Sequence, residues 1–432
     1  TASWSAVARD PKGKELADRA ISWTSSAPQV ASVNASGTIT GVSPGTAEIR
    51  ADAEGKSASE RVTVAAAPAP VTPTPAPAPA PAPGPPAAPP AAASAALLPR
   101  RSAEAGGGLS CGIAQSGAVC WGGAREGLIA VDGTAGISQL SVGRTHACGL
   151  VSGGRAVCWG DNKGGQLGDG SLTSSASAVA VAGELSFSMI SAGAGHTCGI
   201  AGGKVYCWGR GKDGQLGDGS ANDRKKPVPI KGGGSFIAVS AGGNHTCAVT
   251  ASGKAYCWGD GFSGQLGFGA QERQIEPVDV SGDQKFSRIA AGGKHTCGLT
   301  TGGKAFCWGA NDVGQVGDGS KSDRPSPTAV TTGQTFTEIS AGGNHTCALT
   351  SGGEAFCWGE NGAGQLGDGS KVDRNKPVAV SGGFSFTSIS AGEGHSCGMT
   401  RTEAVCWGRN DRGQLGDGST TPRGTPAPVR GE

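Results

Sequence analysis

The residues in this chain best suited to chemistry are fourteen cysteines, which fall into seven pairs. The members of a pair are 9 or 10 residues apart, and the first members recur at steps of 37, 50, 49, 50, 50 and 50 residues. The pairs are Cys111 with Cys120, Cys148 with Cys158, Cys198 with Cys207, Cys247 with Cys257, Cys297 with Cys307, Cys347 with Cys357, and Cys397 with Cys406. A histidine stands two residues before the first cysteine in six pairs, at His146, His196, His245, His295, His345 and His395. Two chemistries are available to these residues: disulfide formation, or metal binding by a His-Cys-Cys set.

The spacing favours disulfides. If Cys347 lies opposite Cys357 in a hairpin, a three-residue loop (351–353) remains, and Cys111 opposite Cys120 leaves the two-residue loop 115–116. Both loop lengths are common, and directly opposed Cα atoms are about 4.5–5.5 Å apart, within disulfide range. Known zinc spacings do not match, whereas an even cysteine count with none left over indicates an oxidising compartment. We predict seven structural disulfides, no metal and no cofactor; the alternative is buried reduced thiols in a cytosolic protein.

The cysteines belong to a larger repeated pattern: Ala-Gly-x-x-His-Thr-Cys, then Cys-Trp-Gly, then Gly-Gln-Leu-Gly-Asp-Gly. The sixth unit contains four strand-like segments, at residues 336–340, 346–350, 354–358 and 377–380. Seven units of four short strands predict an all-β fold, a seven-bladed β-propeller over residues 97–432. We further expect the segment from about Leu98 to Ala105 to complete the last blade and so close the ring.

The other repeated residues favour structural roles. A catalytic histidine is rarely copied six times, so each is expected to hydrogen-bond a loop of the neighbouring blade; the first unit carries Leu109 instead. The tryptophan after each second cysteine is expected to pack between blades. The Asp of Gly-Asp-Gly suits a tight turn better than a calcium site, because the alternating acids and closing Glu of a calcium loop are missing. The third full unit has Phe268 in place of that Asp.

The residues before the repeats form two further parts. Residues 1–66 contain short alternating runs separated by Asn, Ser, Gly and Pro, which predict a small β-sandwich. Residues 67–96 are rich in Pro and Ala and are expected to form an extended linker.

Both folded parts resemble known families. W-T-S-S, V-A-S-V, G-x-I-T-G-V and P-G-T-A-E-I in the first part resemble the bacterial Ig-like domain of group 2, here expected to be truncated at its N-terminus. Residues 106–420 resemble the regulator of chromosome condensation repeat family, in its alpha-tubulin-suppressor-like form. That resemblance implies a propeller that serves as a protein-interaction platform; relatives include exchange factors for a small nuclear GTPase, ubiquitin-ligase modules and secreted inhibitors of β-lactamases.

Composition narrows the function. The net charge is +2 with 16% charged residues and no basic stripe, which argues against nucleic acid, and no apolar run is long enough to span a membrane. We find no asymmetric acid-base cluster, nucleophile elbow or phosphate loop, so we predict no enzymatic activity.

The repeats differ most in the loop after Cys-Trp-Gly, which is therefore the expected partner surface. Its variable residues include Glu126, Asp161, Asn162, Asp213, Asp260, Asn311, Val313, Asn361, Asn410 and Asp411. The candidate binding residues are Arg125, Lys163, Arg210, Lys212, Phe262, Asp312, Glu360, Arg409 and Arg412. We predict a monomeric, exported scaffold at the cell surface, in the medium or in the periplasm, that binds a protein or other macromolecule and is displayed on the Ig-like and Pro-rich stalk. The alternative is a guanine-nucleotide exchange factor for a small GTPase.

Overall fold

A computed structural model of the chain describes residues 2–3, 21–36, 38–53, 56–64, 102–123 and 125–430. The chain divides into two compact units, Thr1–Pro86 and Ala87–Glu432, and each is considered by itself. The predicted linker at residues 67–96 lies outside the described residues.

The N-terminal unit contains two three-stranded sheets, β1-β4-β3 and β2-β5-β6. Its strands are β1 (Ala2–Ser3), β2 (Ser22–Ser25), β3 (Ala31–Val33), β4 (Thr38–Gly41), β5 (Gly45–Ala53) and β6 (Lys56–Val64). Alternate residues of β5 point inward, so Ala47 and Ile49 are buried together with Ala31 and Ile39. Trp23 packs against this small core.

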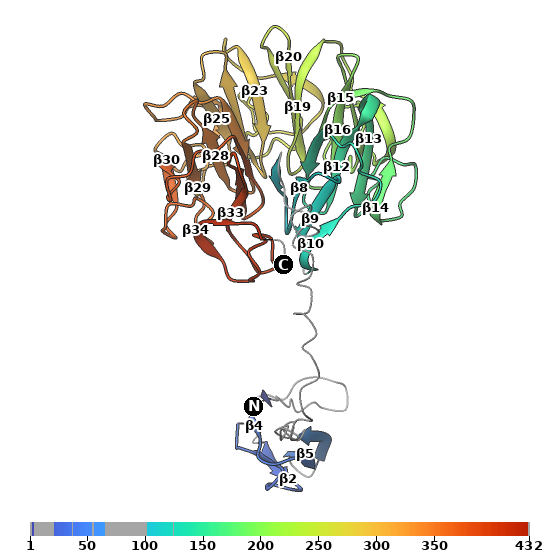
Figure 1. The fold of residues 1–432 in the computed structure, drawn as a ribbon, viewed down its shortest axis with the longest axis vertical. Helices are drawn as coiled ribbons and strands as arrows, with labels where there is room; N and C mark the ends of the chain where they lie inside the picture. The colour runs from blue at the N-terminus through green and yellow to red at the C-terminus, as the bar shows by residue number, and fades with distance from the viewer. Residues whose placement is uncertain are drawn as a thin grey trace, which may run out of the picture. The chain divides into compact units, whose positions relative to one another are not determined.

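The second unit is a ring of seven four-stranded antiparallel sheets, the blades, each made from consecutive strands (Figure 1). Blade 1 consists of β7 (Ala103–Ala105), β8 (Leu109–Ile113), β9 (Ala118–Gly122) and β10 (Arg125–Ala130). Blade 2 consists of β11 (Gln139–Val142), β12 (His146–Val151), β13 (Arg155–Gly160) and β14 (Ser175–Ala180), with the short 3-10 helix η1 (Ser152–Gly154) between β12 and β13. Blade 3 consists of β15 (Phe187–Ala192), β16 (His196–Ala201), β17 (Lys204–Gly209) and β18 (Arg224–Pro229). Blades 4 and 5 are β19 (Phe236–Ala241), β20 (His245–Thr250), β21 (Ala255–Gly259) and β22 (Gln274–Asp279); and β23 (Phe286–Ala291), β24 (His295–Thr300), β25 (Ala305–Gly309) and β26 (Arg324–Ala329). Blades 6 and 7 are β27 (Glu338–Ala341), β28 (His345–Leu349), β29 (Ala355–Gly359) and β30 (Arg374–Ala379); and β31 (Ser388–Ala391), β32 (His395–Met399), β33 (Ala404–Gly408) and β34 (Arg423–Pro428).

The expectation that the N-terminal strand completes the last blade is wrong. The first strand, β7, pairs with β8 in blade 1, and blade 7 has its own outer strand, β34. Blades 1 and 7 nevertheless lie side by side (Figure 1). The contact is made by β7, which lies against β31 and β32. The ring therefore closes through contacts between complete blades, without strand exchange.

A belt of backbone hydrogen bonds makes this closure. In every blade the residue after Ala-Gly (or its equivalent) donates its N–H to the glycine carbonyl of the next blade. The seven bonds run from Gly107, Arg144, Ala194, Gly243, Gly293, Gly343 and Glu393 to Gly143, Gly193, Gly242, Gly292, Gly342, Gly392 and Gly106, at 2.9–3.2 Å. The last bond, from Glu393 to Gly106, joins blade 7 to blade 1. Because every donor has a partner, the belt leaves no open edge.

The belt explains the glycine of the Ala-Gly motif. A Cβ atom at Gly143 would collide with the carbonyl oxygen of Gly193 and press against the ring of His146. The close approach of adjacent blades at the channel therefore requires a residue without a side chain.

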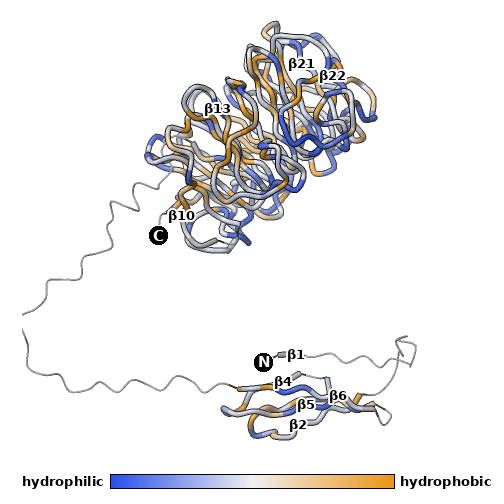
Figure 2. Tube along the Cα trace, turned by 90° about the vertical axis from the view of Figure 1, so that its right-hand side faces the viewer, coloured by the Kyte–Doolittle hydropathy of each residue, from blue (hydrophilic) through white to orange (hydrophobic). Residues whose placement is uncertain are grey.

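The outer strands of five blades carry a proline immediately before the residue that pairs with the second cysteine, at Pro227, Pro277, Pro327, Pro377 and Pro426. Proline has no N–H to offer to an added strand, so it protects the outer edge of the sheet. Figure 2 shows apolar residues (orange) following the strands through the body of the propeller. Within the described residues, no helix is long and apolar enough to cross a membrane.

Candidate interaction face

The seven cysteine pairs are all disulfide-bonded, and the described residues contain no free cysteine. Each pair is directly opposed across the two middle strands of its blade, with Cα atoms 4.0–4.1 Å apart. The bonds join Cys111 to Cys120, Cys148 to Cys158, Cys198 to Cys207, Cys247 to Cys257, Cys297 to Cys307, Cys347 to Cys357, and Cys397 to Cys406.

These bonds leave no thiolate for a metal. The sulfurs are buried in the blade cores. No group of three or more potential metal-binding side chains occurs in the part of the chain that the structure describes. The fourteen cysteines therefore have a structural role: each disulfide holds the two middle strands of its blade together.

The six histidines join neighbouring blades. His196 Nε2 lies 2.8 Å from Thr246 Oγ1 on β20, and the Thr246 hydroxyl donates to the carbonyl of Gln215 at 2.8 Å. Because that hydroxyl proton is already used, the histidine must donate through Nε2. The prediction of a partner in the neighbouring blade is confirmed, but the partner lies on a strand, not on a loop. The same arrangement joins His146, His245, His295, His345 and His395 to Thr197, Thr296, Thr346, Ser396 and Ser110.

Burial keeps these histidines neutral. It lowers the pKa of His146, His295 and His395 to about 4, and that of His196, His245 and His345 to about 3. Neighbouring histidines contribute to the lower pKa values of the second group. In all six, Nδ1 is buried without a hydrogen-bond partner among the described residues. Protonation there would bury an unpaired cation, so these groups are structural and unsuited to acid-base catalysis.

The interface between blades 1 and 2 lacks this bond. Leu109 stands in the histidine position and Ala147 in the threonine position, so both polar partners are replaced by apolar ones and pack together in one cluster. Because both partners are replaced, neither a donor nor an acceptor is left buried without a partner, so the loss of this hydrogen bond costs little stability.

This natural exchange predicts the result of a double-mutant cycle. His196→Leu alone should lower the free energy of unfolding by about 1–3 kcal/mol, because Thr246 loses its donor. Adding Thr246→Ala reproduces the pair of Leu109 and Ala147, so the double variant should be at least about 1 kcal/mol more stable than the sum of the single effects. Urea unfolding measures both values. His196→Leu combined with Thr346→Ala, the partner of His295, is the matched control and should be additive.

The tryptophans also link neighbouring blades by hydrogen bonds. Trp208 is fully buried, and its Nε1 donates at 3.0 Å to the carbonyl of Gln166 in the preceding blade. Equivalent bonds are made by Trp121, Trp258, Trp308, Trp358 and Trp407. The predicted packing between blades is confirmed. Trp159 is the exception, since blade 1 lacks the Gly-Gln-Leu-Gly loop and the described residues offer its buried Nε1 no acceptor.

Replacing these tryptophans by phenylalanine should separate the hydrogen bond from the packing. Trp208→Phe and Trp159→Phe remove a similar volume, but only the first breaks a hydrogen bond. We expect Trp208→Phe to be more destabilising by about 1–2 kcal/mol in urea unfolding. Equal losses of stability in the two variants would contradict this account.

The loops after Cys-Trp-Gly are stabilised by hydrogen bonds among their own side chains and backbone. Asn311 is fully buried; its Nδ2 donates to Asp318 and Ser320, while its Oδ1 accepts the N–H of Val316. Asp318 in turn binds Arg324, with 2.6 Å between Oδ2 and Nε. Burial opposes ionisation of Asp318, but hydrogen bonds from Ser320 and Arg324 outweigh it and lower its pKa. The turn role predicted for the Asp residues is confirmed.

One part of the predicted partner surface is wrong. Asn162, Asn311, Asn361 and Asn410 are completely buried and serve the internal network described above. A polar residue in a variable loop looks like surface in the sequence, whereas here its amide satisfies the backbone of its own loop.

The other candidate residues form one face of the ring. Each loop begins beside the Ala-Gly turn of its own blade, as the hydrogen bond from the Arg210 N–H to the Gly195 carbonyl shows in blade 3. The loops and the mouth of the central channel therefore lie at the same end of the propeller. Seven of the nine candidates are exposed there: Lys163, Arg210, Lys212, Phe262, Asp312, Arg409 and Arg412. Glu360 is half-buried. Arg125 starts β10 in the blade that lacks the loop, and its side chain lies outside the described residues.

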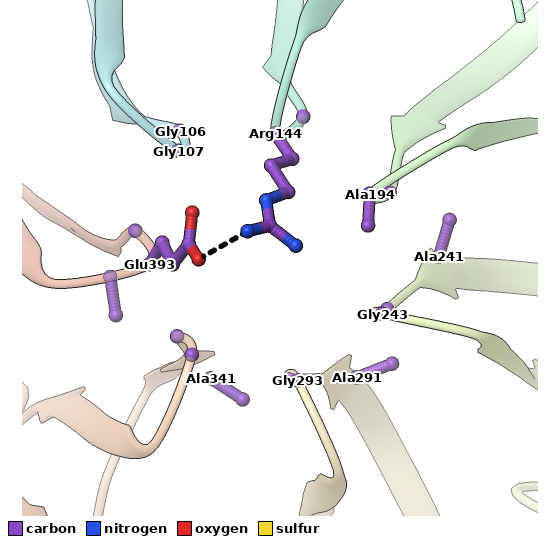
Figure 3. A pocket seen from close by; sticks show the side chains of 18 of the residues that line it. Gly106, Gly107, Arg144, Ala194, Ala241, Gly243, Ala291, Gly293, Ala341 and Glu393 are labelled. Atoms are coloured by element: carbon purple, nitrogen blue, oxygen red, sulfur yellow. Dashed lines mark ion pairs between the residues drawn. The ribbon is translucent and has the colours of Figure 1, made fainter. Parts of the chain in front are cut away.

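The channel mouth lies at the centre of this face. It is a cavity of about 360 Å³ lined by the Ala-Gly turns of all seven blades, with alanine side chains around it (Figure 3). At the position directly after the Ala-Gly step, which is Gly or Ala in the other blades, blades 2 and 7 carry Arg144 and Glu393, and these form an ion pair at 3.0 Å (Figure 3). Lys294, one position further along in blade 5, also lines the mouth. Sequence reasoning missed Arg144 and Glu393, although their departure from Gly or Ala at this repeat position was a usable signal. Both are well exposed, so the pair contributes little to stability.

Comparison with known proteins now places the chain in a family. The family model described as the RCC1-like domain matches residues 101–431. This chain belongs to the RCC1-like family. A second model, the bacterial Ig-like domain of group 2, matches residues 7–64. Among curated proteins, none matches the chain.

Solved structures share the fold of this RCC1-like protein at low sequence identity. Human WBSCR16 is 20% identical with a TM-score of 0.64, over 71% of this chain and 84% of that one. Prp20p from Saccharomyces cerevisiae, whose structure was described with its binding to Gsp1p and histones, is 20% identical with a TM-score of 0.63, over 78% and 88%. Yeast RCC1 (Prp20) bound to Kap60 gives 19% and 0.63, over 78% and 86%. The predicted resemblances to the repeat propeller and to the bacterial Ig-like domain are both confirmed.

Proposed function

We propose that this protein is an exported, non-enzymatic scaffold that binds a partner protein through the loop face of its propeller. The observation that carries the proposal is the contrast between framework and loop tips. The residues shared by the blades are buried and hold the ring together, whereas the third residue after Cys-Trp-Gly varies among Lys, Phe, Asp and Gly in blades 2 to 7 and is exposed in each of these six. These tips are Lys163, Lys212, Phe262, Asp312, Gly362 and Asp411.

Such an arrangement suits recognition. A ring closed by seven disulfide-bonded blades holds six tips of four residue types with little freedom, so binding requires little ordering of the face. The described residues of the propeller contain no acid-base cluster with the properties of an active site, because its buried histidines are hydrogen-bonded in place and its cysteines are oxidised. Seven disulfides and a bacterial Ig-like domain support export from a bacterial cell, with the Ig-like unit and Pro-rich segment as a stalk.

Tip replacement tests this function. In one variant, Lys163, Lys212, Phe262, Asp312 and Asp411 become Gly, the residue that blade 6 already carries at Gly362. In the control variant, exposed residues of the hairpins at the opposite end of the blades become Ala: Arg155, Lys204, Lys304, Glu354 and Glu403. Proteins that the full-length wild type captures from the producing cells are purified. The dissociation constant of each captured protein is then measured with the wild type, the tip variant and the hairpin control.

We expect the tip variant to bind at least about tenfold more weakly, and the hairpin control to bind like the wild type. Equal binding by the tip variant would overturn the proposal. If the captured protein is a small GTPase whose nucleotide release the propeller accelerates, the exchange-factor alternative is the correct one.

A further inference from the structure

Blade 4 differs from the other blades in the loop between β21 and β22. Compared with blade 5, fifty residues later, it has lost five polar side chains of the internal network and keeps Gln265, the equivalent of Gln315. Gly261, Phe268, Ala270, Arg273 and Gln274 stand where blade 5 has Asn311, Asp318, Ser320, Asp323 and Arg324. The polar network that fixes the blade 5 loop is therefore missing from the blade 4 loop, in which Gln274 bonds Glu272 and Phe268 packs inward.

Two of its long side chains face outward instead. Phe262, at the loop tip, is 69% exposed and is the most exposed large apolar side chain among the described residues. Arg273 is also exposed. The loop does have an interior site for an aromatic ring, because Phe268 packs inward against the cluster of Leu266, Phe286 and Trp308. Phe262 is thus outside the core although another phenylalanine of the same loop is partly buried against it.

The exposed ring sits on a fixed support. The N–H of Phe262 donates to Asp260 Oδ1 at 3.0 Å, and the N–H of Ser263 donates to Gln265 Oε1 at 2.8 Å. Arg273 Nη1 donates at 3.2 Å to the carbonyl of Lys212, which links the loop to blade 3. An apolar side chain on a pre-ordered turn loses little entropy on binding, as hot-spot residues of interfaces do.

The charges around Phe262 are unequal on its two sides. The adjoining tip in blade 3 is Lys212, and Arg273 is bonded across to its carbonyl. Arg210, in the same blade 3 loop, lies on the other side, over Gly164 of blade 2. The tip in blade 5 is Asp312. The carboxylates of the blade 4 loop are engaged within it, Asp260 with the Phe262 N–H and Glu272 with Gln274. The side of Phe262 that faces blade 3 thus presents two cations, Lys212 and Arg273, with a single carboxylate, Asp213, next to Lys212 in the chain.

We propose that Phe262 is the anchor of the partner surface and that it packs against an apolar site on a partner protein, flanked by acidic residues that face Lys212 and Arg273. This inference rests on the proposed function and deepens it, by naming the blades that bind and the chemistry they recognise. Charge complementarity of this kind orients a partner, while the aromatic ring supplies most of the binding energy.

The probe for this surface is a random dodecapeptide library displayed on phage and selected against the full chain. Enriched peptides should combine an apolar residue with Asp or Glu. As synthetic peptides, they should bind Phe262→Ala at least tenfold more weakly in fluorescence anisotropy and Arg273→Ala at least threefold more weakly. Arg273→Glu should reverse the charge preference of a new selection. The matched control is Val372→Ala, which removes another exposed apolar side chain, 59% exposed, on blade 6 and should leave binding unchanged.

Three results would overturn the inference: enriched peptides that bind Phe262→Ala as tightly as the wild type, enriched peptides that are basic, or a wild-type dimer that Phe262→Ala converts to monomer in sedimentation. The last would make a second copy of the chain the occupant. Failure here is distinct from failure of the proposed function. If the captured partner is retained by Phe262→Ala but lost by the five-tip variant, only this inference is wrong; if both variants retain it, both are.

Discussion

Reducing all seven disulfides is expected to unfold the propeller. Each bridge closes a loop of 9 or 10 residues, which stabilises the fold by about 2–3 kcal/mol through the unfolded chain. Seven such bridges contribute roughly 15–20 kcal/mol, more than the total stability of about 5–15 kcal/mol that is usual for a protein domain. The blades are small and share their cores only with their neighbours, so no other part of the ring replaces this contribution.

The same bridges should resist reduction while the ring is folded. The cysteine side chains are fully buried, except that Cys120 is 4% exposed. We expect dithiothreitol to leave them intact in buffer and to reduce them in concentrated urea, and far-UV circular dichroism should then show loss of the strands. Intact mass after alkylation follows the reaction, because the oxidised chain is lighter than the reduced one by fourteen hydrogens.

Two outcomes would contradict this account. Reduction in buffer with the strands preserved would show that the bridges do not hold the fold. Fourteen reactive thiols in protein purified without reductant would also remove the main support for export.

Lowering the pH from 7 to 5 should destabilise the propeller more than any single substitution. Burial holds the pKa of the six histidines at about 3 to 4 in the folded state, whereas the ordinary value is 6.5. The unfolded chain therefore binds protons that the folded chain does not, and stability is lost as the pH falls from about 6.5 towards 4. At pH 5 each histidine costs about 2 kcal/mol and the six together roughly 12 kcal/mol.

Two largely buried acids, Glu104 and Glu338, act in the opposite direction, because burial raises the pKa of each carboxyl. Burial raises the pKa of Glu104 to about 7, so its protonation favours the folded state and returns at most about 2.5 kcal/mol at pH 5. The six histidines outweigh the two acids, so the net effect is still a loss of several kcal/mol. Urea midpoints measured at pH 8, 7, 6 and 5 should fall steeply below pH 6.5. The double variant with His196→Leu and Thr246→Ala, which removes one titrating histidine, should reduce the slope by about one sixth, and a stability independent of pH between 7 and 5 would refute the argument.

Much of the propeller follows from local spacing. The distance of 9 or 10 residues between Cys347 and Cys357, or Cys111 and Cys120, allows one hairpin register, and that register pairs the cysteines and sends Trp358 to the opposite side of the strand. The 50-residue period then predicts the number of blades. These features depend on neighbours within one unit, where strand alternation and turn length leave few choices.

The contacts between units did not follow from spacing. His196 meets Thr246, 50 residues away, and His395 meets Ser110, 285 residues away. The chain closes through Glu393 and Gly106 and not through a shared blade, and Asn311 is buried although its loop is variable. Arg144 and Glu393 meet only because blades 2 and 7 bend towards one channel. All these pairs depend on the curvature of the assembled ring, which arises from the packing of whole blades against one another and has no counterpart in the order of residues within a repeat.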